Sequence, residues 1–124
     1  MIKKLPDAEF EVMKIVWANE PPISSSTIIG QLGKEKEWKA RQTSISLLLR
    51  LVERGFLRTE KNGKEREYYP IVTKEEYLKF ETQNFMKIYH QNSFASLVSA
   101  LYGGGDISGD DIETVIKTIK ERGE

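Results

Sequence analysis

The sequence predicts a mainly α-helical protein with one small β-hairpin. Apolar residues recur at helical spacing over most of the chain, and Gly, Pro and Ser residues separate these segments. One Asn-Gly pair, Asn62-Gly63, lies between two short runs that can pair as strands, and such a pair is the strongest local signal of a tight hairpin. The 124 residues suffice for one domain or for two very small ones.

Two helices are predicted in the first third of the chain. The first covers residues 7–19, with Asp7 as its N-cap and a stripe of apolar residues along one face. The second begins at the serines of residues 24–26, which can cap it, and ends at Gly33. A charged connection follows.

The third helix is predicted from about Ala40 to Arg54, and it stops at Gly55, a residue suited to the position after a helix C-terminus. Placing its residues at about 100° per position separates an apolar face from a polar face. The expected core face contains Ile45, Leu48, Leu51 and Val52, and the expected polar face contains Gln42, Thr43, Ser46, Arg50, Glu53 and Arg54.

The second half of the chain is predicted to be helical throughout. Thr73 and Glu76 form a capping box at the start of a long helix, the glycines of residues 103–105 break it, and Ser108 caps a last helix. The long helix carries more apolar surface than an isolated helix can hide, and the last helix carries one apolar stripe. The residues concerned are Phe80, Phe85, Ile88, Tyr89, Phe94, Leu97, Val98, Leu101, Ile112, Val115, Ile116 and Ile119.

The hairpin is predicted to sort its charges by face. If Asn62-Gly63 forms a two-residue loop, Lys61 lies opposite Lys64, and each following pair lies on the other face of the hairpin. One face then collects Lys61, Lys64 and Arg66, and the other collects Arg58, Glu60, Glu65 and Glu67. The hairpin is therefore expected to be cationic on one side, although residues 60–69 carry three charges of each sign.

Three helices followed by a hairpin is the arrangement of a winged helix-turn-helix, in which the third helix enters the major groove of DNA and the hairpin, the wing, contacts the backbone. Gln, Ser, Thr and Arg side chains can bond base edges, and Lys and Arg can bind phosphates. The residues expected to contact DNA are Arg41, Gln42, Thr43, Ser46, Arg50, Lys61, Lys64 and Arg66. Alternating charge is also typical of a solvated strand edge that resists aggregation.

Charge and residue usage narrow the function classes. Residues 1–70 carry 13 Lys and Arg against 10 Asp and Glu, a net charge of +3, and residues 71–124 carry 6 against 9, a net charge of −3. A basic first half suggests an anionic partner. The chain has no cysteine and one histidine, so we expect no metal centre, no cofactor and no enzyme activity. Without an apolar signal segment or membrane span, a cytoplasmic location is the default expectation.

The chain resembles the penicillinase repressor family (BlaI/MecI) over essentially its full length. The segments that carry the resemblance are LPDAEFEVMKIVW at the start, EW followed by TSISLLLRLVERGFL, the hairpin that ends in YY, and SFASLVSALY near the end. The resemblance implies a winged-helix DNA-binding domain over residues 1–71 and a helical dimerisation domain over residues 72–124. The apolar residues named above for the second half, from Phe80 to Ile119, are then the expected dimerisation residues. It further implies a homodimeric repressor that binds a palindromic double-stranded DNA operator.

The resemblance also implies a mode of induction. In the best-known members a membrane-bound sensor peptidase signals cleavage of the repressor within its dimerisation region, which releases DNA and allows genes such as that for β-lactamase to be transcribed. The scissile position of those repressors falls here on Ala100-Leu101, where the residue types differ from the family's Asn-Phe pair. The usual polar or basic base-reading position falls on Ile45, a side chain that can contact only a thymine methyl group.

A second interpretation of the hairpin remains open. A winged-helix module can serve protein–protein contact instead of sequence-specific DNA binding, with the acidic face of the hairpin as the docking edge. The salt dependence of DNA binding separates the two, because phosphate contacts weaken steeply as salt rises.

Overall fold

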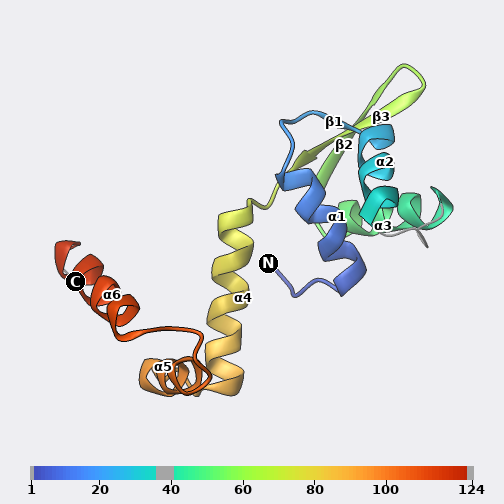
Figure 1. Cartoon of the computed structure of the whole chain (residues 1–124). Coiled ribbons are helices and arrows are strands. Elements are labelled where there is room, and N and C mark those ends of the chain that lie inside the picture. The colour runs from blue at the N-terminus through green and yellow to red at the C-terminus, as the bar shows by residue number, and fades with distance from the viewer. Residues whose placement is uncertain (1, 36–40, 123–124) are drawn as a thin grey trace. The chain divides into compact units, whose positions relative to one another are not determined.

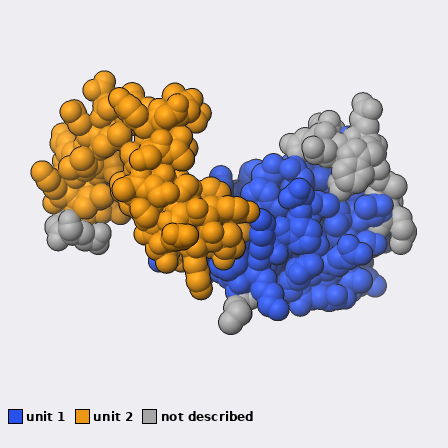
Figure 2. Space-filling model, turned by 90° about the horizontal axis from the view of Figure 1, so that it is seen from below, with its two compact units in different colours: residues 1–80 blue, residues 81–124 orange. Residues whose placement is uncertain are grey.

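The structure is a computed structural model that describes residues 2–35 and 41–122, with the backbone alone described at residues 34–35 and 41–42 (Figure 1). The expected helix start at Ala40 lies outside these residues. The chain divides into two compact units, residues 1–80 and residues 81–124 (Figure 2). We call them unit 1 and unit 2.

Unit 1 has the predicted architecture of a winged helix-turn-helix, which is thereby confirmed. Its sheet is antiparallel with the strand order β1-β3-β2, and the tip of the β2–β3 hairpin extends past the helices (Figure 1). Strand β1 was not predicted, because it is only two residues long. The elements are α1 (Asp7–Trp17), β1 (Ile23–Ser24), α2 (Ser25–Glu35), α3 (Arg41–Glu53), β2 (Leu57–Asn62) and β3 (Glu65–Pro70).

The ends of these helices correct two details of the prediction, the cap of α1 and the end of α2, and confirm a serine cap for α2. Pro6 occupies the cap position of α1, and Asp7 is its first helical residue, where a negative charge suits the positive end of the helix dipole. Ser24 caps α2, because its hydroxyl oxygen accepts a hydrogen bond from the Thr27 N–H at 3.2 Å. Gly33 does not end α2, which continues to Glu35.

The core of unit 1 collects apolar side chains from every helix and strand of the unit. Residue Tyr77, from the first turns of α4 (Lys74–Tyr89), is fully buried in this core. Its hydroxyl oxygen accepts a hydrogen bond from the Leu5 N–H at 2.8 Å, and the Trp17 indole N–H donates to the Val72 carbonyl at 3.0 Å. The first turns of α4 therefore pack as part of unit 1.

A buried ion pair joins α1 to the residue that follows α3. The Glu9 side chain is 1% exposed, and one of its carboxylate oxygens lies 2.5 Å from Nε of Arg54. Removing Arg54 would leave the buried Glu9 carboxylate with poor compensation, whereas the side chain of Arg54 is 38% exposed and keeps contact with water. Arg54, which the helical projection placed on the polar face, is thus engaged in holding the C-terminal end of α3 against α1.

Unit 2 corrects the prediction of a single long helix. Helix α4 ends at Tyr89, and α5 covers Phe94–Gly103. Between them Gln91 and Asn92 have φ angles of 51° and 62°, a left-handed backbone that an α-helix does not contain. The chain continues into α6 (Gly109–Glu121). None of the described helices is long and apolar enough to cross a membrane.

The predicted caps of the second half are confirmed. The Thr73 N–H donates to the Glu76 carboxylate at 2.9 Å, and the Glu76 N–H donates to the Thr73 hydroxyl at 3.1 Å, which completes the capping box of α4. These hydrogen bonds lower the pKa of Glu76, chiefly through the Thr73 backbone N–H. Ser108 caps α6 together with Asp111 in the same way.

Replacing Tyr77 by Phe should destabilise the protein by about 1–3 kcal/mol, because the ring packing stays while the buried Leu5 N–H loses its acceptor. The free energy of unfolding in urea, measured at fixed protein concentration, provides the test. Tyr89→Phe is the matched control, since the side chain of Tyr89 is exposed. Equal stability of both variants would contradict a structural role for the Tyr77 hydroxyl.

Candidate nucleic-acid interface

Helix α3 buries one face in the core and leaves the other to solvent. Its buried side chains are Ser44, Leu47, Leu48 and Leu51. The prediction that Ile45 faces the core is wrong, because Ile45 is 41% exposed, and the neighbouring Leu49 is 58% exposed. Three consecutive leucines span about 200° of a helix, so one of them has to leave the core. Leu49 is the leucine that faces outward, and its exposure was not predicted.

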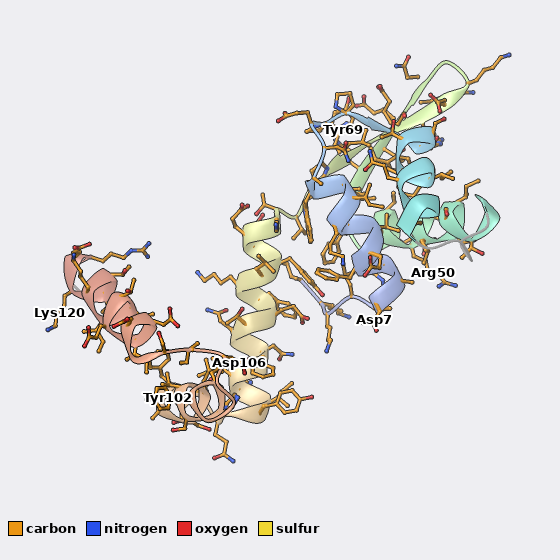
Figure 3. All side chains as sticks on the ribbon, in the orientation of Figure 1. Asp7, Arg50, Tyr69, Tyr102, Asp106 and Lys120 are labelled. Atoms are coloured by element: carbon orange, nitrogen blue, oxygen red, sulfur yellow. The ribbon has the colours of Figure 1, made fainter. Side chains whose placement is uncertain are left out.

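The residues expected to read DNA lie on the outer side of α3 where the structure describes them. Thr43 and Arg50 are exposed, and Ser46 is half-buried. Figure 3 shows the Arg50 side chain extending from α3 into solvent. The side chains of Arg41 and Gln42 lie outside the described residues, so their part in the interface stays a prediction.

Gly55 ends the polar face of α3 and starts the turn into the wing. Its φ angle of +81° lies in the left-handed region, where a side chain is strained. The Phe56 N–H then donates to the Leu51 carbonyl at 2.9 Å, a bond that closes the last turn. The predicted helix stop at Gly55 is confirmed, and it sets the short distance between α3 and β2.

The hairpin loop lies one residue further along the chain than predicted. Asn62 pairs with Glu65 and Lys61 pairs with Arg66, so the two loop residues are Gly63 and Lys64. Gly63 has a φ angle of +65° and Lys64 a negative one, the pattern of a type II′ turn. The predicted pairing of Lys61 with Lys64 is therefore wrong, and Lys64 lies in the turn instead of on the cationic face.

The separation of charge by face survives this change. Moving the loop by one residue shifts each residue of β2 by two positions along β3, and an even shift keeps every side chain on its face. Lys61 and Arg66 remain opposite each other on one face, whereas Glu60 and Glu67 form a pair on the other. The prediction of a cationic side of the wing is confirmed for Lys61 and Arg66.

The cationic face of the wing continues the face that packs on the helices. Leu57 and Tyr68, which are buried, lie on the same face as Lys61 and Arg66 because residues two apart along a strand share a face. Lys61 and Arg66 therefore lie on the side of the sheet that faces the helices, nearer the hairpin tip than the buried residues.

The opposite face of the wing uses its carboxylates internally. The Arg58 guanidinium contacts the Glu60 carboxylate, and it lies 4.0 Å from the centre of the Tyr69 ring. The Glu65 carboxylate accepts a hydrogen bond from the Ser26 hydroxyl at the start of α2. This contact was not predicted, because it joins residues 39 positions apart.

Among the described residues, no three His, Asp or Glu side chains gather in a way that can hold a metal ion. His90 instead shares a 2.9 Å hydrogen bond between its Nδ1 and the Ser96 hydroxyl, at the junction of α4 and α5. What unit 1 offers a partner is thus a helix face with polar, apolar and cationic groups and a wing with a cationic face.

Comparison with known proteins supports the resemblance seen in the sequence. A family model described as penicillinase repressor matches residues 5–121. The chain is 28% identical over 123 residues to the penicillinase repressor of Bacillus licheniformis, covering 97% of this chain and 94% of that protein. It is 31% identical over 120 residues to the methicillin resistance regulatory protein MecI of Staphylococcus aureus strain N315, covering 96% and 95%.

Two solved structures resemble the chain at 34% identity. The solution structure of the DNA-binding domain of the repressor BlaI has a TM-score of 0.54 and covers 60% of this chain and 88% of that one. The solution structure of monomeric Bacillus licheniformis BlaI in complex with the blaP half-operator has a TM-score of 0.52 and covers 62% and 92%. From a family match over nearly its whole length and relatives aligned from end to end, we conclude that the chain belongs to the penicillinase repressor family.

Proposed function

We propose that this protein is a homodimeric transcriptional repressor that binds a palindromic DNA operator through two copies of unit 1. The observation that carries this proposal is the relative at 34% identity whose structure was solved with a half-operator bound. The cationic face of the wing, with Lys61 and Arg66 exposed beyond the core, supports it independently.

Each part of the interface has a distinct role in this proposal. The exposed side of α3, with Thr43, Ser46 and Arg50, enters the major groove, together with Arg41 and Gln42 at its N-terminal end. Lys61 and Arg66 bind backbone phosphates, and Lys64 reaches the backbone from the turn. Contacts of α3 with base edges select the sequence, whereas contacts of the wing with phosphates hold the protein in register on the DNA.

Dimerisation through unit 2 is supported by the apolar surface that this unit leaves exposed. None of its described side chains is fully buried, so unit 2 has no core of its own within one chain. Helices α5 and α6 instead line an apolar groove of about 340 Å³, whose residues include Phe94, Leu97, Val98, Leu101, Ile112, Val115, Ile116 and Ile119. A second copy can cover this surface, as obligate dimers do with apolar interfaces.

The remaining predicted dimerisation residues lie on α4. Phe85, Ile88 and Tyr89 are exposed near its C-terminal end, where the rings of Phe85 and Tyr89 lie 5.0 Å apart. Phe80, by contrast, is partly buried against the core of unit 1, with its ring 6.0 Å from that of Tyr77. In the proposed dimer, the surface of α4 therefore begins after Phe80.

Release from DNA is proposed to follow from loss of the dimer. Residues Ala100 and Leu101, the possible cleavage position, lie within α5, and Leu101 lines the apolar groove. Cleavage there would separate α6 from most of α5 and remove one wall of the groove. A membrane sensor peptidase or a downstream protease would supply the signal in the cytoplasm, and the names of the relatives support β-lactam resistance genes as the targets.

A docking module that uses the acidic face of the wing is the second candidate, because Glu60 and Glu67 form a pair on that face and Glu65 lies on it as well. The carboxylates of Glu60 and Glu65 contact Arg58 and Ser26 at the surface of unit 1. Such exposed contacts contribute little to stability, so a partner can replace them at small cost.

Replacing Lys61 and Arg66 by Ala should weaken DNA binding to a similar extent for all sequences and reduce the slope of log K against log salt by about 2, since each phosphate contact contributes about 0.9. The affinity of the full chain for a selected operator, titrated at several salt concentrations, provides the measurement. Lys74→Ala with Lys79→Ala removes the same charge from α4 and should leave the slope unchanged. A flat salt response of the unmodified protein would favour the docking module.

Replacing Ile116 by Asp should convert the dimer into monomers at micromolar concentration, because it places a charge in the apolar groove. Sedimentation equilibrium gives the oligomeric state. Affinity for a full palindrome should fall on the order of 10²-fold, whereas affinity for a half-site stays the same. Thr114→Asp is the control, since Thr114 lies on the opposite side of α6. A dimer that persists in Ile116→Asp would contradict the proposed interface.

A further inference from the structure

Two large apolar side chains are exposed one turn apart on the outer side of α3. Ile45 is 41% exposed and Leu49 is 58% exposed, although the same helix buries Ser44 in the core. Residues four apart on a helix are neighbours on its surface, with their Cβ atoms about 5–6 Å apart. Ile45 and Leu49 thus form one continuous apolar strip, which we call the α3 apolar pair.

The proposed function supplies the occupant of the pair. On the helix surface the pair is followed one turn later by the exposed Glu53, whereas Thr43 and Arg50 lie further round the helix. If α3 enters the major groove, its outer side meets base edges there, chiefly through the N-terminal part of the helix. The carboxylate of Glu53 lies beyond that part, at the C-terminal end of α3.

DNA offers one apolar group in its major groove, the C5-methyl group of thymine. Neither Ile nor Leu can form a hydrogen bond through its side chain, so this pair cannot read the donors and acceptors of the base edges. The Cβ separation of about 5–6 Å lies between one and two base steps of about 3.4 Å each. The two side chains can therefore contact methyl groups on neighbouring or next-neighbouring base pairs.

We propose that Ile45 and Leu49 read the methyl groups of two nearby thymines in each operator half-site. The proposal rests on the proposed function and adds selection by apolar contact to the hydrogen bonds that the polar residues of α3 can form. It assigns sequence selection at those positions to apolar contact, while Thr43, Ser46 and Arg50 read polar edges.

The test replaces thymine by deoxyuridine, which keeps the base-pairing groups and lacks only the methyl group. The full-length protein first selects a duplex from a pool of random-sequence DNA. Each thymine of the selected half-site is then replaced in turn, and the affinity is measured for the unmodified protein, Ile45→Ala, Leu49→Ala and the control Ile71→Ala. Ile71 is an exposed isoleucine outside the interface, so this variant carries the same chemical change elsewhere.

We expect the unmodified protein and Ile71→Ala to lose about three- to tenfold in affinity at two thymines no more than two base pairs apart, the effect of one buried methyl group each. Ile45→Ala should become indifferent to deoxyuridine at one of them and Leu49→Ala at the other. Both variants alter exposed side chains, and unchanged thermal unfolding would show that they keep the fold.

Three outcomes would overturn the proposed role of the α3 apolar pair in reading thymine methyl groups. The first is a selected duplex at which no thymine responds to deoxyuridine, and the second is an unchanged response in both Ala variants. The third is a response abolished by Thr43→Ala instead, which would assign the methyl contact to that side chain. Selection of a sequence with steep salt dependence and no methyl response overturns this inference alone, whereas failure to select any sequence overturns the proposed function with it.

Discussion

The rotation of α3 about its own axis is the constraint on which the candidate interface depends. The helix is held by the side chains that it buries, from Ser44 to Leu51, and by the pairing of Arg54 with the buried Glu9. Because these contacts fix one side in the core, they also decide which residues remain outside. Which residues of α3 face outward is thus a result of packing in unit 1, and Glu9, a buried residue of α1, contributes to it.

The sequence was sufficient for the three helices and the hairpin of unit 1, but not for strand β1 or for the orientation of every side chain. Gly55 marked the end of α3 correctly, since a left-handed residue there is a local requirement. The facing of Ile45 depended on which of three adjacent leucines the core would exclude, and that choice is made by the shape of the surrounding helices. Similarly, Asn62-Gly63 and Gly63-Lys64 are both acceptable two-residue loops, so tertiary contacts and not local turn chemistry select the register.

The second half of the chain shows the same division between local and non-local information. The caps at Thr73 and Ser108 were readable because each depends on residues three positions apart. The interruption after Tyr89 was missed, since Gln91 and Asn92 adopt left-handed angles without a glycine or proline to announce them. None of the described side chains of unit 2 is buried, so contacts within one chain do not determine which faces of its helices are covered.

The sorting of charge on the wing also bears on how the hairpin can change in length during evolution. Each face of the wing keeps one sign of charge because of how the two strands pair. Every pair, such as Lys61 with Arg66, joins an odd-numbered residue to an even-numbered one. Insertion of a single residue in one strand would send the outer part of that strand to the other face and bring a carboxylate towards the helix side. Changes that add or remove two residues, or one in the loop, preserve the sorting. Related wings should therefore tolerate length variation at the tip and resist it within the strands.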